Sequence, residues 1–282
     1  MIRDVYFADN LSVLEQLPSE LVQLIYIDPP FNTGKKQVRN NIKTVRSEQG
    51  DHSGFGGKVY RTEFLSQSSY DDAFTDFWAF LKPRLIEAHR LLKETGTLYL
   101  HLDYREVHYA KVELDKIFGR ENFLNEIIWA YDFGAKSKKR WPTKHDNILV
   151  YVKNLQKYYF NSERVDREPY MAPGLVTAEQ VKRGKLPTDT WWSTIVSPTG
   201  QEKTGYPTQK PLKILKRIIN ASSDSDDLVL DFFAGSGTTG QAAFELGRQF
   251  VLIDNNIQAI ETMKKRFAGL PVNFHNKIDK GG

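Results

Sequence analysis

The stretch LVLDFFAGSGTTG, residues 228–240, decides the fold of this 282-residue chain. Its apolar run leads through Asp231 into a glycine-rich turn, and a helical pattern then leads to a second apolar run, residues 250–253, which ends at Asp254. Glycines permit a sharp turn and the close approach of a ligand, and the start of a helix offers free amide donors. An acid at the end of the next strand can bind two ribose hydroxyls. We therefore prefer a nucleoside-cofactor site here to a simple tight turn.

The late position of this unit predicts how the sheet is built. In dinucleotide dehydrogenases the glycine unit normally begins the nucleotide-binding domain, whereas here only residues 231–282 remain after it starts. Because too few strands follow, strands from the N-terminal half must complete the sheet. Strand patterns occur at residues 5–7, 21–27, 98–102, 126–130 and 147–152, and helical patterns at 11–17, 72–92, 105–118 and from Pro211. We expect an α/β fold with a mostly parallel, doubly wound, Rossmann-like sheet and helices on both faces.

The apolar run at 21–27 ends in Asp28-Pro29-Pro30-Phe31. The prolines fix φ and bias the residues before them towards extended geometry, which holds the Asp28 carboxylate at the mouth of a strand. Taken alone, this is an ordinary strand-ending turn. If both ends of the chain share one sheet, the turn lies beside the glycine loop at the carboxyl edge, where open α/β sheets bind ligands.

These two motifs resemble motifs IV and I of the amino-group DNA methyltransferases, which modify adenine N6 or cytosine N4. Their order, catalytic motif first and cofactor motif last, resembles the circularly permuted β class. Thr208-Gln209-Lys210-Pro211 is similar to motif X, and residues 96–101, GTLYLH, resemble the strand after the catalytic helix. The resemblance spans most of the chain and implies a restriction–modification type of enzyme with S-adenosylmethionine as cofactor and double-stranded DNA as partner.

The resemblance also implies roles for single residues at the catalytic motif. The target base is flipped out of the duplex, because an amino group inside the stack is out of reach. Asp28 and the carbonyl of Pro29 then accept hydrogen bonds from that amino group, Pro30 stiffens the turn and Phe31 stacks on the base. Direct in-line transfer follows, with positioning supplying much of the acceleration. An Asp-Pro-Pro-aromatic motif favours adenine, with cytosine N4 as the alternative and an NAD-binding dehydrogenase or regulator as the alternative of another class.

For the cofactor, the resemblance assigns ribose hydroxyls to Asp254 and the carboxylate of the methionine part to motif X. Asp9 would bond the adenine amino group, although a helix N-cap is an equal interpretation of this residue. The full expected set is Asp9, Thr208, Gln209, Lys210, Asp231, Phe233, Ala234, Gly235, Ser236, Gly237 and Asp254.

The chain contains no cysteine, so it cannot form a thiolate zinc site or a disulfide. It also cannot methylate cytosine carbon 5, which requires attack by a thiolate. The histidines show no metal-ligand spacing, and we expect no metal. Without a signal-peptide core or an apolar run long enough for a bilayer, a cytoplasmic protein is expected. The resemblance to DNA methyltransferases implies a bacterial or phage type that is associated with the nucleoid.

Residues 1–152 and 204–282 are expected to form the catalytic and cofactor-binding domain, and residues 153–203 an inserted target-recognition region, which could be a separate small lobe. Residues 34–69, basic and glycine-bearing, are expected to lack regular structure and to be a mobile loop over the active-site mouth, or else a plain solvated insertion. Basic residues interleaved with aromatic ones suit phosphate contacts and base stacking, with a solvated face as the alternative. The expected DNA contacts are Lys136, Lys138, Lys139, Arg140, Trp141, Lys182, Arg183, Trp191 and Trp192. A second copy and a cognate restriction endonuclease are further partners that the resemblance suggests.

Overall fold

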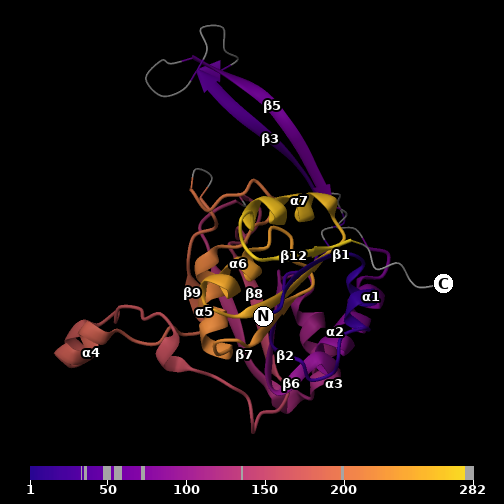
Figure 1. Ribbon diagram of the computed structural model, residues 1–282. Coiled ribbons are helices and arrows are strands. Elements are labelled where there is room, and N and C mark those ends of the chain that lie inside the picture. The colour runs from indigo at the N-terminus through magenta and orange to yellow at the C-terminus, as the bar shows by residue number, and fades with distance from the viewer. Residues whose placement is uncertain are drawn as a thin grey trace.

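A central sheet forms the framework of the chain, as the computed structural model in Figure 1 shows. The structure describes residues 1–32, 34, 37–46, 52–53, 59–70, 74–134, 136–197 and 200–276. Within these residues the sheet has nine strands in the order β12-β1-β11-β10-β2-β6-β8-β7-β9. The strands are β1 (Arg3–Phe7), β2 (Val22–Ile27), β6 (Leu92–Leu102), β7 (Phe123–Ala130), β8 (His145–Val152), β9 (Thr190–Trp192), β10 (Leu228–Asp231), β11 (Gln249–Asp254) and β12 (Asn273–His275). Only β8 runs antiparallel to its neighbours, so the expected mostly parallel sheet is confirmed.

Helices cover both faces of this sheet because its strands are apolar on both sides. All six residues of β2 are buried, and from Leu24 to Ile27 successive residues belong in turn to two different cores. Ile25 and Ile27 pack with α1 (Asn10–Leu14), α2 (Phe77–Leu91) and α3 (Val107–Phe118). Leu24 and Tyr26 belong to the core built with α5 (Leu212–Ser222), α6 (Thr238–Glu245) and α7 (Ile257–Arg266). The sheet therefore joins the strands of both ends of the chain, as the position of the glycine unit required.

The expectation that residues 34–69 lack regular structure was wrong. β3 (Gln37–Arg46) and β5 (Val59–Tyr70) pair as a long antiparallel ribbon that extends away from the sheet, and β4 (His52–Ser53) joins β5 (Figure 1). The glycines at 50, 54, 56 and 57, which suggested an irregular chain, all fall between β3 and β5. Residues 35–36, 47–51 and 54–58 of the expected loop lie outside the described residues.

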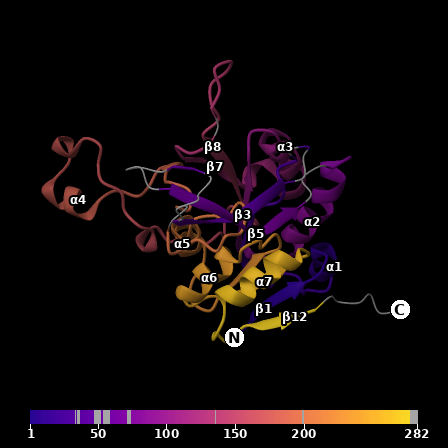
Figure 2. The same cartoon turned by 90° about the horizontal axis from the view of Figure 1, so that it is seen from above.

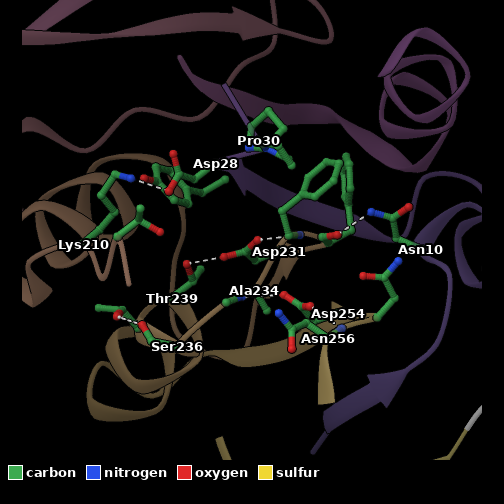
Figure 3. A pocket seen from close by; sticks show the side chains of 18 of the residues that line it. Asn10, Asp28, Pro30, Lys210, Asp231, Ala234, Ser236, Thr239, Asp254 and Asn256 are labelled. Atoms are coloured by element: carbon green, nitrogen blue, oxygen red, sulfur yellow. Dashed lines mark hydrogen bonds and ion pairs between the residues drawn. The ribbon is translucent and has the colours of Figure 1, made fainter. Parts of the chain in front are cut away.

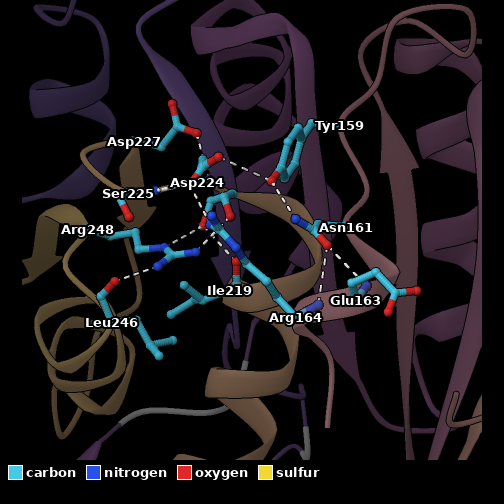
Figure 4. Close-up of polar contacts among 11 residues, drawn as sticks. Tyr159, Asn161, Glu163, Arg164, Ile219, Asp224, Ser225, Asp227, Leu246 and Arg248 are labelled. Carbon is cyan, nitrogen blue, oxygen red and sulfur yellow. Dashed lines mark hydrogen bonds and ion pairs between the residues drawn. The ribbon is translucent and has the colours of Figure 1, made fainter. Parts of the chain in front are cut away.

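The inserted segment 153–203 is tied to the body at both ends. It contains the short helices η3 (Ser162–Arg164), η4 (Pro173–Leu175) and α4 (Ala178–Arg183). Another short helix, η2 (Arg120–Asn122), lies earlier in the chain, between α3 and β7. The one strand described in the segment, β9, pairs parallel with β7 and so belongs to the main sheet. Near its start, the backbone N–H of Asn161 donates to the carbonyl of Ala221 at 2.7 Å and Arg164 pairs with Asp224 (Figure 4). Only the middle of the segment, which carries α4, projects as an arm (Figure 2).

No helix among the described residues is both long and apolar enough to cross a bilayer.

Candidate active site

The carboxyl ends of the parallel strands β1, β2, β10 and β11 meet at one edge of the sheet, and a cavity of about 580 Å³ opens there. The cavity collects residues from both halves of the chain. Of the expected site residues it is lined by Asp9, Asp28, Pro29, Pro30, Phe31, Thr208, Gln209, Lys210, Asp231, Phe233, Ala234, Gly235, Ser236 and Asp254. Gly237 is the one member of the expected set that does not line it.

The Asp28 carboxylate is held at this cavity by a lysine from motif X (Figure 3). Its Oδ2 contacts Nζ of Lys210, and the two side chains are only 16% and 10% exposed. Its Oδ1 is buried and has no hydrogen-bond partner among the described residues. Because a buried oxygen without a donor costs about 1–3 kcal/mol, this atom is an acceptor prepared for a ligand N–H or O–H. The Lys210 ammonium also lies 5.3 Å from the centre of the Phe31 ring.

The loop before Lys210 is held in an unusual backbone conformation. Thr208 has a φ of +58°, which a β-branched residue adopts only where its surroundings enforce it. Gln209 supplies that restraint: its Oε1 accepts from the N–H and the hydroxyl of Thr204 at 2.9 and 2.8 Å, and its Nε2 donates to the Glu202 carbonyl at 2.8 Å. Gln209, expected to meet a cofactor, therefore fixes the loop that presents Lys210.

Two acids, Asp231, which is buried, and Asp254, which is partly exposed, organise the glycine turn. Asp254 accepts hydrogen bonds from the backbone N–H groups of Gly235 and Asn256, both at 2.8 Å, and burial raises its pKa to about 6. Asp231 accepts from the N–H of Phe233 at 3.0 Å and from the Thr239 hydroxyl at 2.6 Å, and burial raises its pKa to about 7. Asp231 is thus engaged inside the turn, whereas Asp254 stands at the strand end where a ribose is expected (Figure 3).

The glycines of the turn are needed for backbone geometry and for packing. Gly235 and Gly237 have φ values of +50° and +74°. A Cβ on Gly237 would lie 2.7 Å from Cγ of Met263 on α7, so this glycine lets two helices approach. Ser236, expected to bind the cofactor, pairs its hydroxyl with that of Thr238 at 2.9 Å.

Asp9 caps a helix, so that interpretation of the residue is confirmed. Its Oδ1 accepts from the N–H of Ser12 at 3.3 Å, and its Oδ2 pairs with Arg84 at 2.8 Å. Arg84 was missed from the sequence, where it stands among the apolar residues of α2. It lines the cavity, donates to Asn10 Oδ1 at 2.5 Å and lies 3.9 Å from the centre of the Phe80 ring. Burial lowers the pKa of its guanidinium.

A largely buried polar chain lies behind the turn at Asp28. The Tyr26 hydroxyl and Nδ1 of His101 are 2.8 Å apart, and Nε2 of His101 lies 3.2 Å from Asp146 Oδ2. The Tyr131 hydroxyl donates to the other Asp146 oxygen at 3.0 Å. Although burial acts to raise the pKa of Asp146, its hydrogen bonds hold that pKa below the usual value. His101 is fully buried, and Phe31 lies against it with 6.0 Å between ring centres. These hydrogen bonds thus join β2, β6 and β8 directly behind the turn at Asp28.

The expected DNA contacts fall into separate places (Figure 2). Lys136, Lys138, Lys139, Arg140 and Trp141 lie exposed on the connection between β7 and β8. Lys182 and Arg183 end α4 on the projecting arm, and Trp192 is 77% exposed on β9. The expectation that Trp191 stacks on bases was wrong, because strand alternation turns it inward, where it is buried and its Nε1 donates to the Thr188 carbonyl.

Comparisons with known proteins agree with this geometry. Residues 22–265 match the model of the N6/N4 family described as DNA methylase. DNA adenine methyltransferase YhdJ of Escherichia coli is 31% identical over 272 residues, which cover 94% of this chain and 82% of the relative. The type II methyltransferase M.HpaI of Haemophilus parainfluenzae is 29% identical over 259 residues, covering 92% and 72%.

Solved structures share the fold. The M1.HpyAVI complex with S-adenosylmethionine has a TM-score of 0.59 at 23% identity and covers 95% of this chain and 100% of that one. The cytosine-N4-specific PvuII DNA methyltransferase has a TM-score of 0.66 at 16% identity, covering 96% and 88%. The family match decides against an NAD-binding dehydrogenase. The chain belongs to the N6/N4 family of DNA methylases, whose catalytic and glycine-rich motifs it carries in permuted order.

Proposed function

We propose that this protein transfers a methyl group from S-adenosylmethionine to the N6 amino group of adenine within a recognition sequence in duplex DNA. The observation that supports this most directly is Asp28. One of its oxygens is engaged by Lys210 and the other is buried without a partner among the described residues, at the wall of the cavity. A carboxylate oxygen in that state suits the N–H of an incoming exocyclic amino group.

The residues present fit the methyl donor. A cavity of about 580 Å³ can take a nucleoside with an amino-acid tail. Asp254 and the Gly235 turn would hold the ribose, and motif X, through Lys210, would face the methionine carboxylate. When bound, S-adenosylmethionine supplies an electrophilic methyl group on a sulfonium centre.

This chain's own part in the reaction is positioning. Asp28 and the Pro29 carbonyl accept hydrogen bonds from the amino group, which raises the electron density on a nitrogen that the ring otherwise depletes. Phe31, supported by the buried His101, stacks on the base and fixes the line of attack. Reactant alignment of this kind lowers a barrier substantially without a covalent enzyme intermediate.

Adenine is favoured over cytosine by the Asp-Pro-Pro-aromatic motif and by the name of the E. coli relative. The likeness to the cytosine-N4 enzyme concerns the fold alone. N4 methylation of cytosine is therefore the second candidate, because the same two acceptors serve either amino group.

Incubation of the protein with labelled S-adenosylmethionine and unmethylated bacterial DNA tests this proposal. Mass spectrometry of the digested nucleosides should give N6-methyladenine, and sequencing of modified positions should give the site. N4-methylcytosine would correct the base, and no transfer at all would refute the proposal.

Asp28→Asn should lower the turnover about 100-fold or more, the scale for losing one positioned transition-state contact, while calorimetry still detects cofactor binding. Asp226→Asn is the matched control, because that exposed residue precedes β10 at the opposite edge of the sheet. Full activity of Asp28→Asn would contradict the assigned role.

A cognate restriction endonuclease is a proposed partner that rests on the restriction–modification names of the relatives. A second copy of the chain is a proposed partner that rests on the resemblance to the permuted class alone. We also propose that the protein is associated with the nucleoid, because its proposed substrate is DNA. Sedimentation of the protein with and without duplex DNA tests the second copy.

A further inference from the structure

The connection between β7 and β8, residues 131–144, is strongly basic and carries an exposed tryptophan. Residues 132–144 contain five lysines or arginines and one aspartate, an excess equal to the +4 of the whole protein. Trp141 directly follows three of these cations, Lys138, Lys139 and Arg140, and is 93% exposed. A large aromatic ring in water has a hydration cost that stacking on another ring would remove. The surrounding cations indicate that the partner is anionic.

Hydrogen bonds hold the backbone of this hairpin in place, although most of its side chains are exposed. The N–H of Tyr131 donates to the Lys144 carbonyl at 2.9 Å and closes its base. The Ser137 hydroxyl accepts from the backbone N–H groups of Lys139 and Arg140, both at 3.2 Å, and shapes the turn before Trp141. Pro142 then restricts the Trp141 backbone to extended conformations, which limits the entropy that binding would cost.

The hairpin stands at the catalytic edge. β7 ends and β8 begins at the edge where β2 delivers Asp28, and only β6 separates β8 from β2. At the usual strand spacing its base is roughly 10 Å from the catalytic strand. The buried chain from Tyr131 through Asp146 and His101 to Tyr26 joins the two rigidly. The hairpin projects outward from this base (Figure 2).

We propose that Trp141 enters the base stack of the DNA when the target base leaves it, and stacks on the bases that remain. The inference rests on the proposed function, because only an enzyme that extrudes a base leaves such a gap. Apolar side chains that wedge between base steps are a known way to meet the cost of unstacking. Stacking of an aromatic ring on a base is itself favourable and tolerates any base. The neighbouring cations would contact phosphates and set the register of the hairpin on the duplex.

The test compares two duplexes that carry the mapped site, one fully paired and one with an abasic position opposite the target base. With the paired duplex, Trp141→Ala should transfer the methyl group about tenfold more slowly in a single turnover, the scale of one lost stacking contact. With the abasic duplex, where the base is already free, the loss should shrink to about threefold or less. The single-turnover rate of Trp141→Phe on the paired duplex should lie between the rates of wild type and Trp141→Ala.

Trp192→Ala is the matched control, because Trp192 is also exposed but lies on β9 and not on the hairpin. It should affect both duplexes equally. Trp141→Ala should leave the salt dependence of DNA binding unchanged, whereas Lys138→Ala should reduce its slope by about one phosphate contact.

If Trp141→Ala lost the same factor in transfer rate on both duplexes, or lost none, the proposed insertion of Trp141 into the base stack would be overturned. A wild-type protein that methylates neither duplex would refute the proposed function itself, and calorimetry with S-adenosylmethionine together with thermal melting identifies any variant that is misfolded.

Discussion

Single carboxylates in this cavity differ in what their surroundings do to them. Asp28 has the Lys210 ammonium beside it. Asp231 is only 3% exposed, and its hydrogen-bond donors are uncharged: the Thr239 hydroxyl and the N–H of Phe233. Burial raises the pKa of Asp231 to about 7, and the charges of Asp28 and Asp254 add to the effect. Asp231 is therefore a group whose ionisation opposes folding.

The sign of the resulting pH dependence is fixed. Because the folded pKa of Asp231, about 7, exceeds its ordinary value of 3.8, its contribution to stability is fully present below pH 3.8 and is lost as the pH rises through 7. Asp231→Asn keeps the shape and both partners and does not titrate. The difference in free energy of unfolding between Asp231→Asn and wild type should rise by about 2 kcal/mol in favour of the variant from pH 5 to pH 8, or roughly 4–8 °C in melting temperature.

Melting curves of the two proteins across this pH range measure that gain, with Asp226→Asn on the surface as the control. A difference between Asp231→Asn and wild type that stays constant from pH 5 to pH 8 would contradict the prediction.

At the scale of elements, the turn between β10 and α6 depends on glycine for two separable reasons. Gly237 and Gly247 both have a φ of +74°, but a Cβ would lie 2.7 Å from Met263 Cγ at Gly237 and would meet nothing within 4 Å at Gly247. Gly247→Ala should cost about 1 kcal/mol for its backbone alone, and Gly237→Ala at least about 3 kcal/mol, because overpacking adds to strain.

Denaturant titration of both variants measures the two costs. Gly237→Ala should also weaken S-adenosylmethionine binding in calorimetry, because α6 must shift to relieve the contact, whereas Gly247→Ala should not. Equal losses of stability would show that the approach of α7 does not matter.

The elements that could be predicted from the sequence are those with a continuous or regularly spaced pattern of apolar residues. β2 and β10 are buried at every position, so their apolar runs were visible without partners. The ribbon of β3 and β5 was missed, because its order comes from pairing between segments some twenty residues apart. Trp191 and Trp192 could not be told apart by composition, since only the direction of β9 decides which one faces solvent.

At the scale of the whole molecule, the site was predictable because topology determines it. Strands from both ends of the chain share one sheet, so Asp28 and the glycine turn had to meet at its carboxyl edge. Contacts between residues far apart in the sequence could not be predicted from local sequence patterns. Lys210 lies 182 residues from Asp28, and Arg84 lies 74 from Asn10, and no local pattern links either pair.

The projecting arm provides the last prediction, because the fold does not depend on it. Met171 and Leu175 are 95% and 86% exposed, so the arm buries little apolar area. Two backbone hydrogen bonds between Glu168 and Lys185, at 2.9 and 2.8 Å, bring the ends of residues 169–184 side by side. Replacing these residues with Asn-Gly, a favoured two-residue hairpin turn, should change the melting temperature by no more than about 2 °C.

Cofactor affinity in calorimetry should also be unchanged by this deletion, because the cavity lies at the carboxyl edge and takes no residue from the arm. Methylation of the mapped site should fall at least about tenfold if Lys182 and Arg183 contact phosphates there, and the salt dependence of DNA binding should weaken by up to two contacts. A double variant, Lys182→Ala with Arg183→Ala, is the control that removes charge and keeps the arm. Unaltered methylation by the deletion variant would exclude the arm from target recognition.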